Sequence, residues 1–263
     1  MTDSQPGTEA FTIRSSRVSA ARKLVRRRAR DKERKFLAEG PQAIREALAA
    51  GAVRELFYTE RVLSRHADLV REAPRSALVT EEALAALAET VTPQGMVAVC
   101  DYLECLLPPD PRLVVVLDRI SDPGNAGTIL RAADAAGADL VVFGSDSVDP
   151  YNGKCVRSSA GSLFHLPVMR GADTGEALSL FDAQVLAAAA DGEDVFALRD
   201  SGDLAAPTVW LFGSEPHGLD DDTAGLAHRK VGVPIWGGAE SLNLGVAAGV
   251  CLYTTAAEQR KPS

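Results

Sequence analysis

Short apolar runs recur along the second half of the chain, separated by stretches of mixed polarity. A run of this kind bounded by glycine, proline or polar residues is typical of a strand buried on both faces. The pattern predicts strands at residues 113–117, 140–143, 185–189, 209–212 and 231–235, with helices at residues 126–136, 156–161 and 242–255. Strands that alternate with helices indicate an α/β fold with a largely parallel sheet covered on both faces.

The first half of the chain predicts a smaller α/β domain. We expect a basic helix at residues 18–34 and a second helix at residues 42–50, which residues 36–41 open. Strands are expected at residues 53–58, 77–79 and 96–100, and a further helix at residues 81–89. Three prolines in residues 108–111 can continue neither a helix nor a central strand. We therefore place a disordered tail at residues 1–14, a first domain at residues 15–106, a linker at residues 107–112 and a second domain at residues 113–258.

Three segments of the second domain place glycine and polar side chains after an expected strand. In residues 118–131 an Asp-Pro-Gly turn leads into a helix that begins at or near Asn125, and Arg131 lies on the same face as Gly127, four residues earlier. Residues 212–219 and 233–244 each end an apolar run in glycines, where the backbone turns sharply or lets a ligand come close. Cofactor pockets are often built in this way.

Together these segments resemble the SPOUT class of RNA methyltransferases, and within it the SpoU/TrmH family of ribose 2′-O-methyltransferases. Three family motifs, Asn-x-Gly-x-x-x-Arg, Gly-x-Glu-x-x-Gly and Pro-x-x-Gly ahead of Ser-Leu-Asn, are matched by Asn125, Gly127 and Arg131, by Gly213, Glu215 and Gly218, and by Pro234, Gly237, Ser241, Leu242 and Asn243. Residues 149–164 also resemble the family's connecting segment. One position departs from the pattern: two positions after Asn243 the family often has Ser or another small residue, and this chain has Gly245, a change that we expect to matter little for chemistry.

The resemblance implies a SPOUT architecture in which the sheet closes with a deep trefoil knot, although chains are rarely knotted. It also implies an upstream substrate-binding domain, RNA as the substrate, S-adenosylmethionine as the methyl donor and a homodimer. The expected last helix supports the dimer, because residues 244–253 are apolar nearly all round and need a partner surface.

Cofactor binding is expected at backbone and apolar positions of the second and third motifs. Glycine turns let the main chain approach the ligand, and apolar side chains flank its adenine, so donor specificity comes mostly from backbone hydrogen bonds. The expected cofactor-binding residues are Leu211, Gly213, Val233, Ile235, Gly238 and Leu242.

By the same resemblance, Arg131 contacts the acceptor ribose and takes part in activating its hydroxyl. A guanidinium keeps its proton, with a pKa above about 12. Arg131 therefore fits the role of a cation that stabilises the developing alkoxide better than that of a general base. We expect Glu215 to fix the guanidinium, and Asn125, Ser241 and Asn243 to orient the ribose. Ser241 has an equally strong alternative role as the N-cap of the last helix.

Charge is distributed unevenly along the chain. The net charge is −8, yet residues 11–40 hold eleven Lys and Arg against three Asp and Glu, a local +8. A basic face on an acidic protein is expected of an RNA-binding module, whereas the alternative is a solvated helix whose charges only keep it soluble. The expected RNA-binding residues are Arg17, Lys23, Arg26, Arg27, Arg28 and Arg157.

Membrane, secreted and metal-binding proteins are disfavoured. No apolar run approaches the roughly 20 residues that span a bilayer, and the polar amino terminus lacks the apolar stretch of a secretion signal. Cys100, Cys105, Cys155 and Cys251 have no Cys-x-x-Cys spacing, and no His, Cys and carboxylate residues cluster as metal ligands do. We expect a cytoplasmic protein with reduced thiols, no membrane contact and no metal.

Three functions can be compared. A dinucleotide-binding oxidoreductase needs Gly-x-Gly-x-x-Gly after the first strand, which is missing. A non-catalytic RNA-binding protein would have no reason to keep the polar residues of all three motifs. The sequence therefore favours an RNA ribose 2′-O-methyltransferase. Ribosomal RNA is preferred over transfer RNA as its substrate, because an extra amino-terminal domain is typical of the branches that act on ribosomal RNA.

Overall fold

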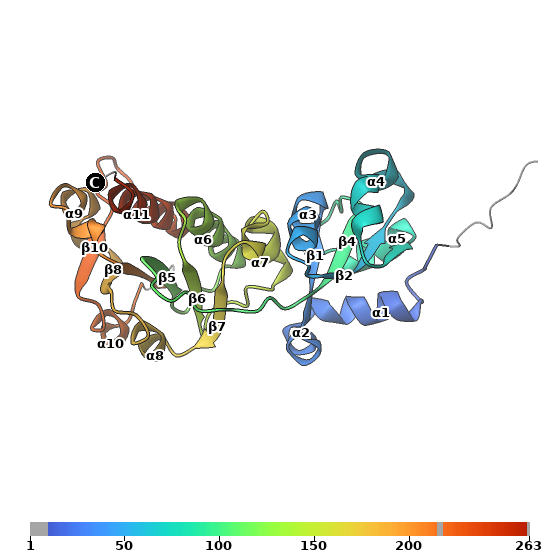
Figure 1. The fold of residues 1–263 in the computed structure, drawn as a ribbon, viewed down its shortest axis with the longest axis horizontal. Coiled ribbons are helices and arrows are strands. Elements are labelled where there is room, and N and C mark those ends of the chain that lie inside the picture. Colours follow the sequence, from blue (N-terminus) through green and yellow to red (C-terminus); the bar gives the residue numbers. More distant parts are fainter. Residues whose placement is uncertain (1–9, 215–217, 262–263) are drawn as a thin grey trace, which may run out of the picture. The chain divides into compact units, whose positions relative to one another are not determined.

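The computed structural model describes residues 10–214 and 218–261. Contacts divide the chain into an amino-terminal unit, residues 1–102 with 151–161, and a carboxyl-terminal unit, residues 103–150 with 162–263. Each unit has its own sheet (Figure 1). In the described part of the chain, no helix is long and apolar enough to cross a membrane.

The amino-terminal unit is built on a four-stranded sheet of order β1-β4-β2-β3. β4 pairs antiparallel with β1 and β2, and β2 pairs parallel with β3. The strands are β1 (Lys35–Glu39), β2 (Val53–Tyr58), β3 (Ser76–Leu78) and β4 (Met96–Asp101). The helices are α1 (Ser16–Arg22), η1 (Lys23–Val25), α2 (Arg27–Glu33), α3 (Pro41–Ala49), η2 (Glu60–Val62), α4 (Leu63–Glu72), α5 (Glu81–Leu87) and α7 (Gly153–Ser158).

The prediction of one helix at residues 18–34 is wrong, because the chain bends at Arg26. Arg26 has an extended backbone (φ −94°, ψ 130°) between η1 and α2. Leu24 is buried just before the bend. After it, Arg30 is only 3% exposed and donates from Nη1 to the carbonyls of Leu24 (3.1 Å) and Val25 (2.8 Å). A member of the basic run thus satisfies backbone groups that the interrupted helix leaves unpaired.

Residues 36–41 were expected to open a helix, and this prediction is also wrong. Arg34 takes a left-handed conformation (φ 55°) that ends α2, and the chain continues as β1. Phe36, Leu37 and Ala38 are buried and pair with β4. The second helix, α3, begins only at Pro41, whose fixed φ suits a first helical position.

The predicted disordered tail falls partly outside the described residues, which begin at Ala10. From there to residue 14 the chain is ordered. Phe11 donates its backbone N–H to the Leu78 carbonyl (2.8 Å) and accepts from the N–H of Thr80 (3.0 Å). Its ring packs against the core of the amino-terminal unit, which explains the order.

The carboxyl-terminal unit contains a six-stranded sheet of order β10-β8-β9-β5-β6-β7, and every neighbouring pair is parallel. This confirms the predicted α/β fold with a parallel sheet; the trefoil knot stays a prediction. The strands are β5 (Leu113–Leu117), β6 (Leu140–Gly144), β7 (Val168–Ala172), β8 (Gln184–Asp194), β9 (Thr208–Phe212) and β10 (Arg229–Gly232). The helices are α6 (Pro123–Ala136), η3 (Ser162–Phe164), α8 (Thr174–Leu178), α9 (Val195–Asp200), η4 (Asp203–Ala205), α10 (Asp221–Ala224) and α11 (Leu244–Gln259).

Helices cover both faces of this sheet. Figure 1 shows α6 and α11 side by side over one face, with α8 and α10 on the other side. Side chains of β9 alternate between the faces: the indole of Trp210 donates to Thr255 Oγ1 on α11 (2.9 Å), whereas Leu211 packs in the cluster that includes Leu178 of α8.

Three helix starts differ from the predictions. α6 begins at Pro123, and its N-cap is Asp122, whose carboxylate accepts from the N–H of Asn125 (2.8 Å). α11 begins at Leu244 with Asn243 as its N-cap, so Ser241 does not open that helix. The helix expected at residues 156–161 is α7, which begins earlier, at Gly153.

Candidate functional site

A cavity of about 550 Å³ lies at the carboxyl ends of β9 and β10 and beside residues 188–190 of β8, within the carboxyl-terminal unit. Loops beyond the carboxyl ends of parallel strands are where open α/β sheets bind ligands. Its lining includes seven of the residues expected at the site, from all three motifs: Asn125, Gly213, Val233, Ile235, Ser241, Leu242 and Asn243. The fold therefore brings together segments that are more than a hundred residues apart in the sequence.

The second motif forms a tight turn against the cavity. A side chain at Gly213 would overlap the backbone of Gly218 and Leu219, so only glycine fits there. Ser214 and Gly218 close the turn, with the Gly218 N–H donating to the Ser214 carbonyl (2.8 Å), and Gly218 has a positive φ of 65°. Glu215, expected to fix Arg131, lies outside the described residues.

The first and third motifs are joined by two amides. Asn243 Nδ2 donates to Asn125 Oδ1 at 2.9 Å. Asn243 Oδ1 accepts from the N–H groups of Gly245 (3.0 Å) and Val246 (3.3 Å), which caps α11. Because the cap requires the oxygen, the amide nitrogen must face Asn125. The two helices also approach closely here, since a side chain at Gly245 would contact Thr128 Cγ2 at 2.8 Å.

An ion-paired arginine ties the loop before the first motif to the segment after the second. Arg119, with a left-handed φ of 52°, contacts Asp118 (2.8 Å) and Asp220 (2.6 Å). Asp220 is the N-cap of α10. Hydrogen bonds from the side chain and the N–H of Thr223, together with that from Arg119, lower the pKa of its carboxyl to about 2. The Asp220 carboxylate is thereby held in the charged form that both contacts require.

Arg131 lies on α6 with its side chain exposed, and it is not part of the cavity lining. No residue in the described ranges forms a hydrogen bond or ion pair with its guanidinium. The cation is thus accessible to a substrate from outside the cavity.

Two of the six expected cofactor-binding residues, Leu211 and Gly238, do not line the cavity. Leu211 is fully buried in the sheet and faces the α8 side. Gly238 is exposed in the loop before α11 and does not line the cavity. Neither position puts the residue in the cavity wall.

Sequence reasoning missed part of the lining, namely Ala188, Ala189, Ala190, Gly232, Ala247 and Cys251. The run of alanines in the middle of β8 was a signal for a space there, but the pattern also fits a buried strand. Burial raises the pKa of the Cys251 thiol to about 12, so this lining residue stays protonated and apolar in character.

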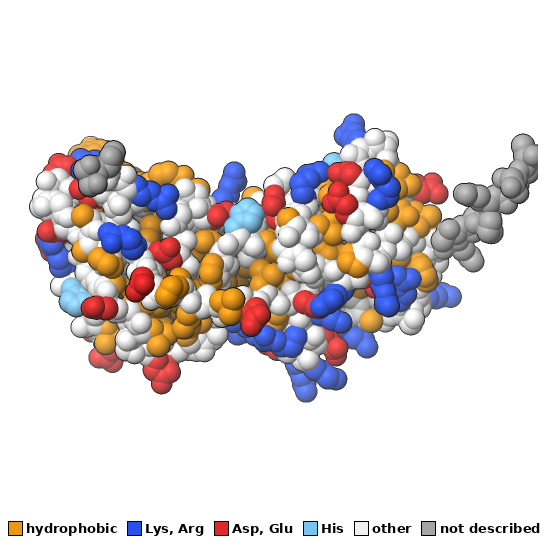
Figure 2. Space-filling view, in the orientation of Figure 1, with side chains coloured by type: hydrophobic (Ala, Val, Ile, Leu, Met, Phe, Trp, Pro, Cys, Tyr) orange, Lys and Arg blue, Asp and Glu red, His pale blue; other side chains and the backbone are white. Residues whose placement is uncertain are grey.

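The basic residues of the first domain are mostly exposed. Figure 2 shows Lys and Arg side chains gathered over α1 and α2. Lys23, Arg26, Arg27 and Arg28 are exposed, while Arg17 is half-buried, pairs with Glu55 and lies 4.7 Å from the centre of the Phe11 ring. Arg157, also expected to contact RNA, is engaged by Glu39 and Glu89 inside the amino-terminal unit.

Among the described residues, no group of three or more His, Cys, Asp or Glu side chains is arranged to hold a metal ion. The cavity is lined by backbone, apolar side chains, amides and serine hydroxyls.

Two family models match the chain. Residues 112–253 match the SpoU rRNA Methylase family, and residues 15–98 match the MRM3-like substrate binding domain. The chain is 34% identical over 250 residues to the 23S rRNA (guanosine(2553)-2′-O)-methyltransferase RlmP of Bacillus subtilis, covering 92% of this chain and 96% of that one. It is 33% identical to the 23S rRNA (uridine(2479)-2′-O)-methyltransferase of Streptomyces viridochromogenes, covering 94% and 92%.

Two solved structures are similar to this chain over nearly its whole length. The SpoU methyltransferase AviRb from Streptomyces viridochromogenes, in complex with the cofactor AdoMet, superposes with a TM-score of 0.83 at 30% identity, covering 95% of this chain and all of that one. An AdoMet-bound rRNA methyltransferase from Sinorhizobium meliloti superposes with a TM-score of 0.78 at 29% identity, covering 94% and 97%.

Proposed function

Because the chain belongs to the SpoU rRNA methylase family, we propose that it methylates a ribose 2′-hydroxyl of ribosomal RNA with S-adenosylmethionine as the donor. The observation that carries the proposal is the hydrogen bond between Asn125 and Asn243 at the wall of a glycine-lined cavity. It joins the motif expected on the acceptor side to the motif expected to hold the donor.

The cavity fits the proposed donor in size and chemistry. A cavity of about 550 Å³ is within the range that takes a nucleoside-sized ligand. Its wall has small side chains and glycines, at which backbone N–H and C=O groups can meet a purine and a ribose, and apolar Val233, Ile235 and Leu242 to cover a ring. When bound, the sulfonium supplies an electrophilic methyl group.

The protein must then align a weak nucleophile with that methyl group and help its proton to leave. In the proposal Arg131 binds the phosphate and ribose of the target nucleotide, and its fixed positive charge stabilises the alkoxide as it develops. Asn125, Ser241 and Asn243 orient the ribose, and Glu215 fixes the guanidinium.

RNA binding is assigned to residues 15–106, with the linker at residues 107–112 between this domain and the catalytic one. The proposed phosphate contacts are exposed: Lys23 of η1, Arg26 at the bend, and Arg27 and Arg28 of α2. The match to a substrate binding domain over residues 15–98 supports this assignment. The proposed location is the cytoplasm, where the ribosomal RNA of the bacterial relatives is found.

A homodimer is part of the proposal. α11 is apolar on most sides, and it leaves Val246 52% and Tyr253 54% exposed. Large apolar side chains in one exposed row are typical of a surface that a second copy covers. Sedimentation at micromolar concentration should show a dimer; a Tyr253→Glu variant should shift it toward monomer, and a monomeric wild type would contradict this part.

The function is tested by incubating the protein with methyl-labelled S-adenosylmethionine and total RNA. Label should enter ribosomal RNA and map to one 2′-O-methylated nucleotide. Label confined to transfer RNA would favour the alternative substrate. No label in any RNA, from a protein that still binds S-adenosylmethionine, would favour a non-catalytic RNA-binding role.

A further inference from the structure

Residues 151–161 lie inside the span that matches the methyltransferase family, yet they belong to the amino-terminal unit. The chain leaves the carboxyl-terminal unit after Pro150, forms α7, and rejoins it at Ser162. We call residues 151–161 the strap. Its contacts show that it is a built part of the amino-terminal unit.

The strap is anchored first by aromatic packing. Tyr151 is 2% exposed, and its ring centre lies 4.6 Å from that of Phe36 and 4.1 Å from that of Tyr102, nearly parallel to the latter at 14°. The guanidinium of Arg34 lies over the Tyr102 ring, 4.8 Å from its centre. A buried aromatic cluster of this kind contributes beyond its apolar area, so the strap does not detach readily.

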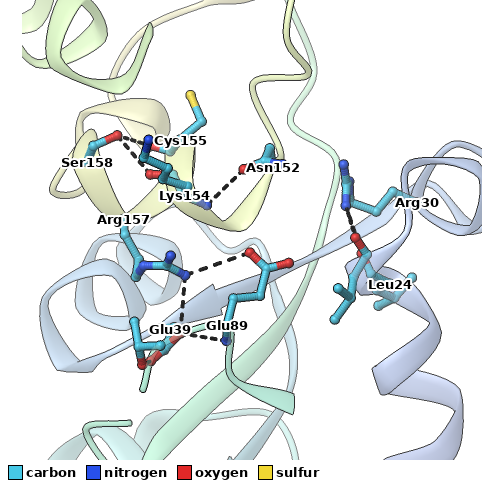
Figure 3. A network of polar contacts seen from close by, with 11 residues as sticks. Leu24, Arg30, Glu39, Glu89, Asn152, Lys154, Cys155, Arg157 and Ser158 are labelled. Atoms are coloured by element: carbon cyan, nitrogen blue, oxygen red, sulfur yellow. Dashed lines mark hydrogen bonds and ion pairs between the residues drawn. The ribbon is translucent and has the colours of Figure 1, made fainter. Parts of the chain in front are cut away.

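A partly buried ion-pair network forms the second anchor (Figure 3). Arg157 Nη1 lies 3.3 Å from Glu39 Oε2 and 3.8 Å from Glu89 Oε2. The side chain of Glu39 is 8% exposed and also accepts from the Glu89 N–H (3.3 Å) and from Thr90 Oγ1. Removing one member of such a group leaves a poorly solvated charge without its partner.

Close approach of backbone gives the third anchor. Gly161 has a φ of 103°, and a side chain there would contact Glu46 Cγ on α3 at 2.5 Å. Ala160 precedes it with a φ of 50°, a conformation that L-residues rarely adopt. The chain thus turns back at the end of the strap through two consecutive left-handed residues.

Both ends of the strap continue into fixed positions of the carboxyl-terminal unit. Before it, Asp149 pairs with Arg170 of β7 at 3.3 Å. After it, His165 Nδ1 lies 2.8 Å from Asp134 of α6. Asp134 is three residues beyond Arg131 on the same helix, so a continuous series of bonds and contacts links β1 to the helix that carries Arg131.

We propose that the strap couples RNA held by the amino-terminal unit to α6, and that Arg157 is a positioning residue that fastens it, rather than a phosphate contact. This inference rests on the proposed RNA methylation. The guanidinium is already engaged by Glu39 and Glu89, while exposed cations are available elsewhere on the same unit. Loosening the strap should leave donor and RNA binding largely intact and slow the transfer step.

The experiment compares Arg157→Gln with Lys154→Gln, which removes the same charge from an exposed position of the strap. Arg157→Gln should lower kcat at saturating RNA at least 10-fold, with the Kd for S-adenosylmethionine unchanged and the salt slope of RNA binding as in wild type. A phosphate contact would instead reduce that slope by about 0.7 to 0.9. Lys154→Gln should keep kcat near that of wild type.

Glu39→Gln provides the decisive second variant, because a carboxylate cannot bind phosphate. It should reproduce the loss in kcat, and the double variant should be no worse than either single one. A reduced salt slope for Arg157→Gln, or wild-type kcat for Glu39→Gln, would overturn the proposal.

Hydrogen exchange without RNA separates this inference from the proposed function. Amides of residues 151–161 should lose protection in Arg157→Gln and not in Lys154→Gln. If wild type methylates no RNA, the proposed function fails, whereas unchanged protection in Arg157→Gln would overturn the strap alone.

Discussion

Asn243 donates its amide hydrogen to Asn125 while its amide oxygen caps α11, so one side chain both starts a helix and joins it to α6. The two residues are 118 positions apart. Each function uses a different atom of the amide, which makes the two roles separable by substitution.

Asn243→Asp should keep the cap and lose the link. A carboxylate still accepts from the N–H groups of Gly245 and Val246, but it cannot donate to Asn125 and places negative charge beside that oxygen. We expect stability within about 0.5 kcal/mol of wild type and a clear loss of methyl transfer. Thermal unfolding and single-turnover transfer measure the two effects.

Asn243→Ala serves as the matched comparison, because it removes the cap as well. Its thermal stability should fall by about 1 kcal/mol. If Asn243→Asp transfers methyl groups at the wild-type rate, the amide link has no role at the site.

The buried Arg30 should matter for stability although it belongs to a basic run. Arg30→Ala leaves the Leu24 and Val25 carbonyls without their donor and should reduce the free energy of unfolding by about 2 kcal/mol or more. Arg28→Ala, at an exposed position of the same helix, should stay within about 0.5 kcal/mol. Urea unfolding of both variants gives the comparison, and equal effects would argue against the assigned role of Arg30.

Replacing Arg26, Arg27 and Arg28 together by Ala should weaken RNA binding and flatten its salt dependence. Each lost phosphate contact lowers the slope of log K against log salt by about 0.7 to 0.9. The control replaces Arg65, Arg71 and Arg75, which are exposed on α4 and the following turn of the same unit. Equal slopes for the two triple variants would mean that α2 is only solvated surface.

Asp220→Asn should lower the thermal stability of the protein at pH values above about 4 and have little effect near pH 2. The folded-state pKa of Asp220 is lowered from 3.8 to about 2, so the carboxylate's contribution is fully present above about pH 4 and is lost as pH falls toward 2. Asn remains a good N-cap, so the variant loses chiefly the ion pair with Arg119. The difference in Tm between wild type and variant should therefore shrink between pH 4 and pH 2; a constant difference would exclude the ion pair as its cause.

The sequence was sufficient for the parallel sheet and for seven of the residues that line the cavity, because both depend on local patterns. Apolar runs mark the strands, and the motifs follow where those strands end. The caps of α6 and α11 were not predictable in this way. Asp122 and Asn125, like Ser241 and Asn243, are all good N-cap residues, and packing such as that of Gly245 against Thr128 decides between them.

Burial of charged residues was the second feature that could not be predicted from the sequence. Arg30 and Arg157 are indistinguishable from their exposed neighbours in a basic sequence, yet one satisfies backbone carbonyls and the other pairs with Glu39. Residues 36–38 show the related ambiguity of a short apolar run, which fits a helix start or a strand until its partner β4 is known.

Arg131 gives the most direct test of the catalytic proposal. Arg131→Ala should reduce kcat about 100- to 1000-fold, as expected when a fixed charge that stabilises a developing oxyanion is removed. The Kd for S-adenosylmethionine should be unchanged, because Arg131 does not line the cavity. Arg131→Lys should recover part of the rate, since it keeps the charge but not the fork of donors. Wild-type turnover in Arg131→Ala would exclude the role, and a large loss of donor affinity would place the residue on the cofactor side instead.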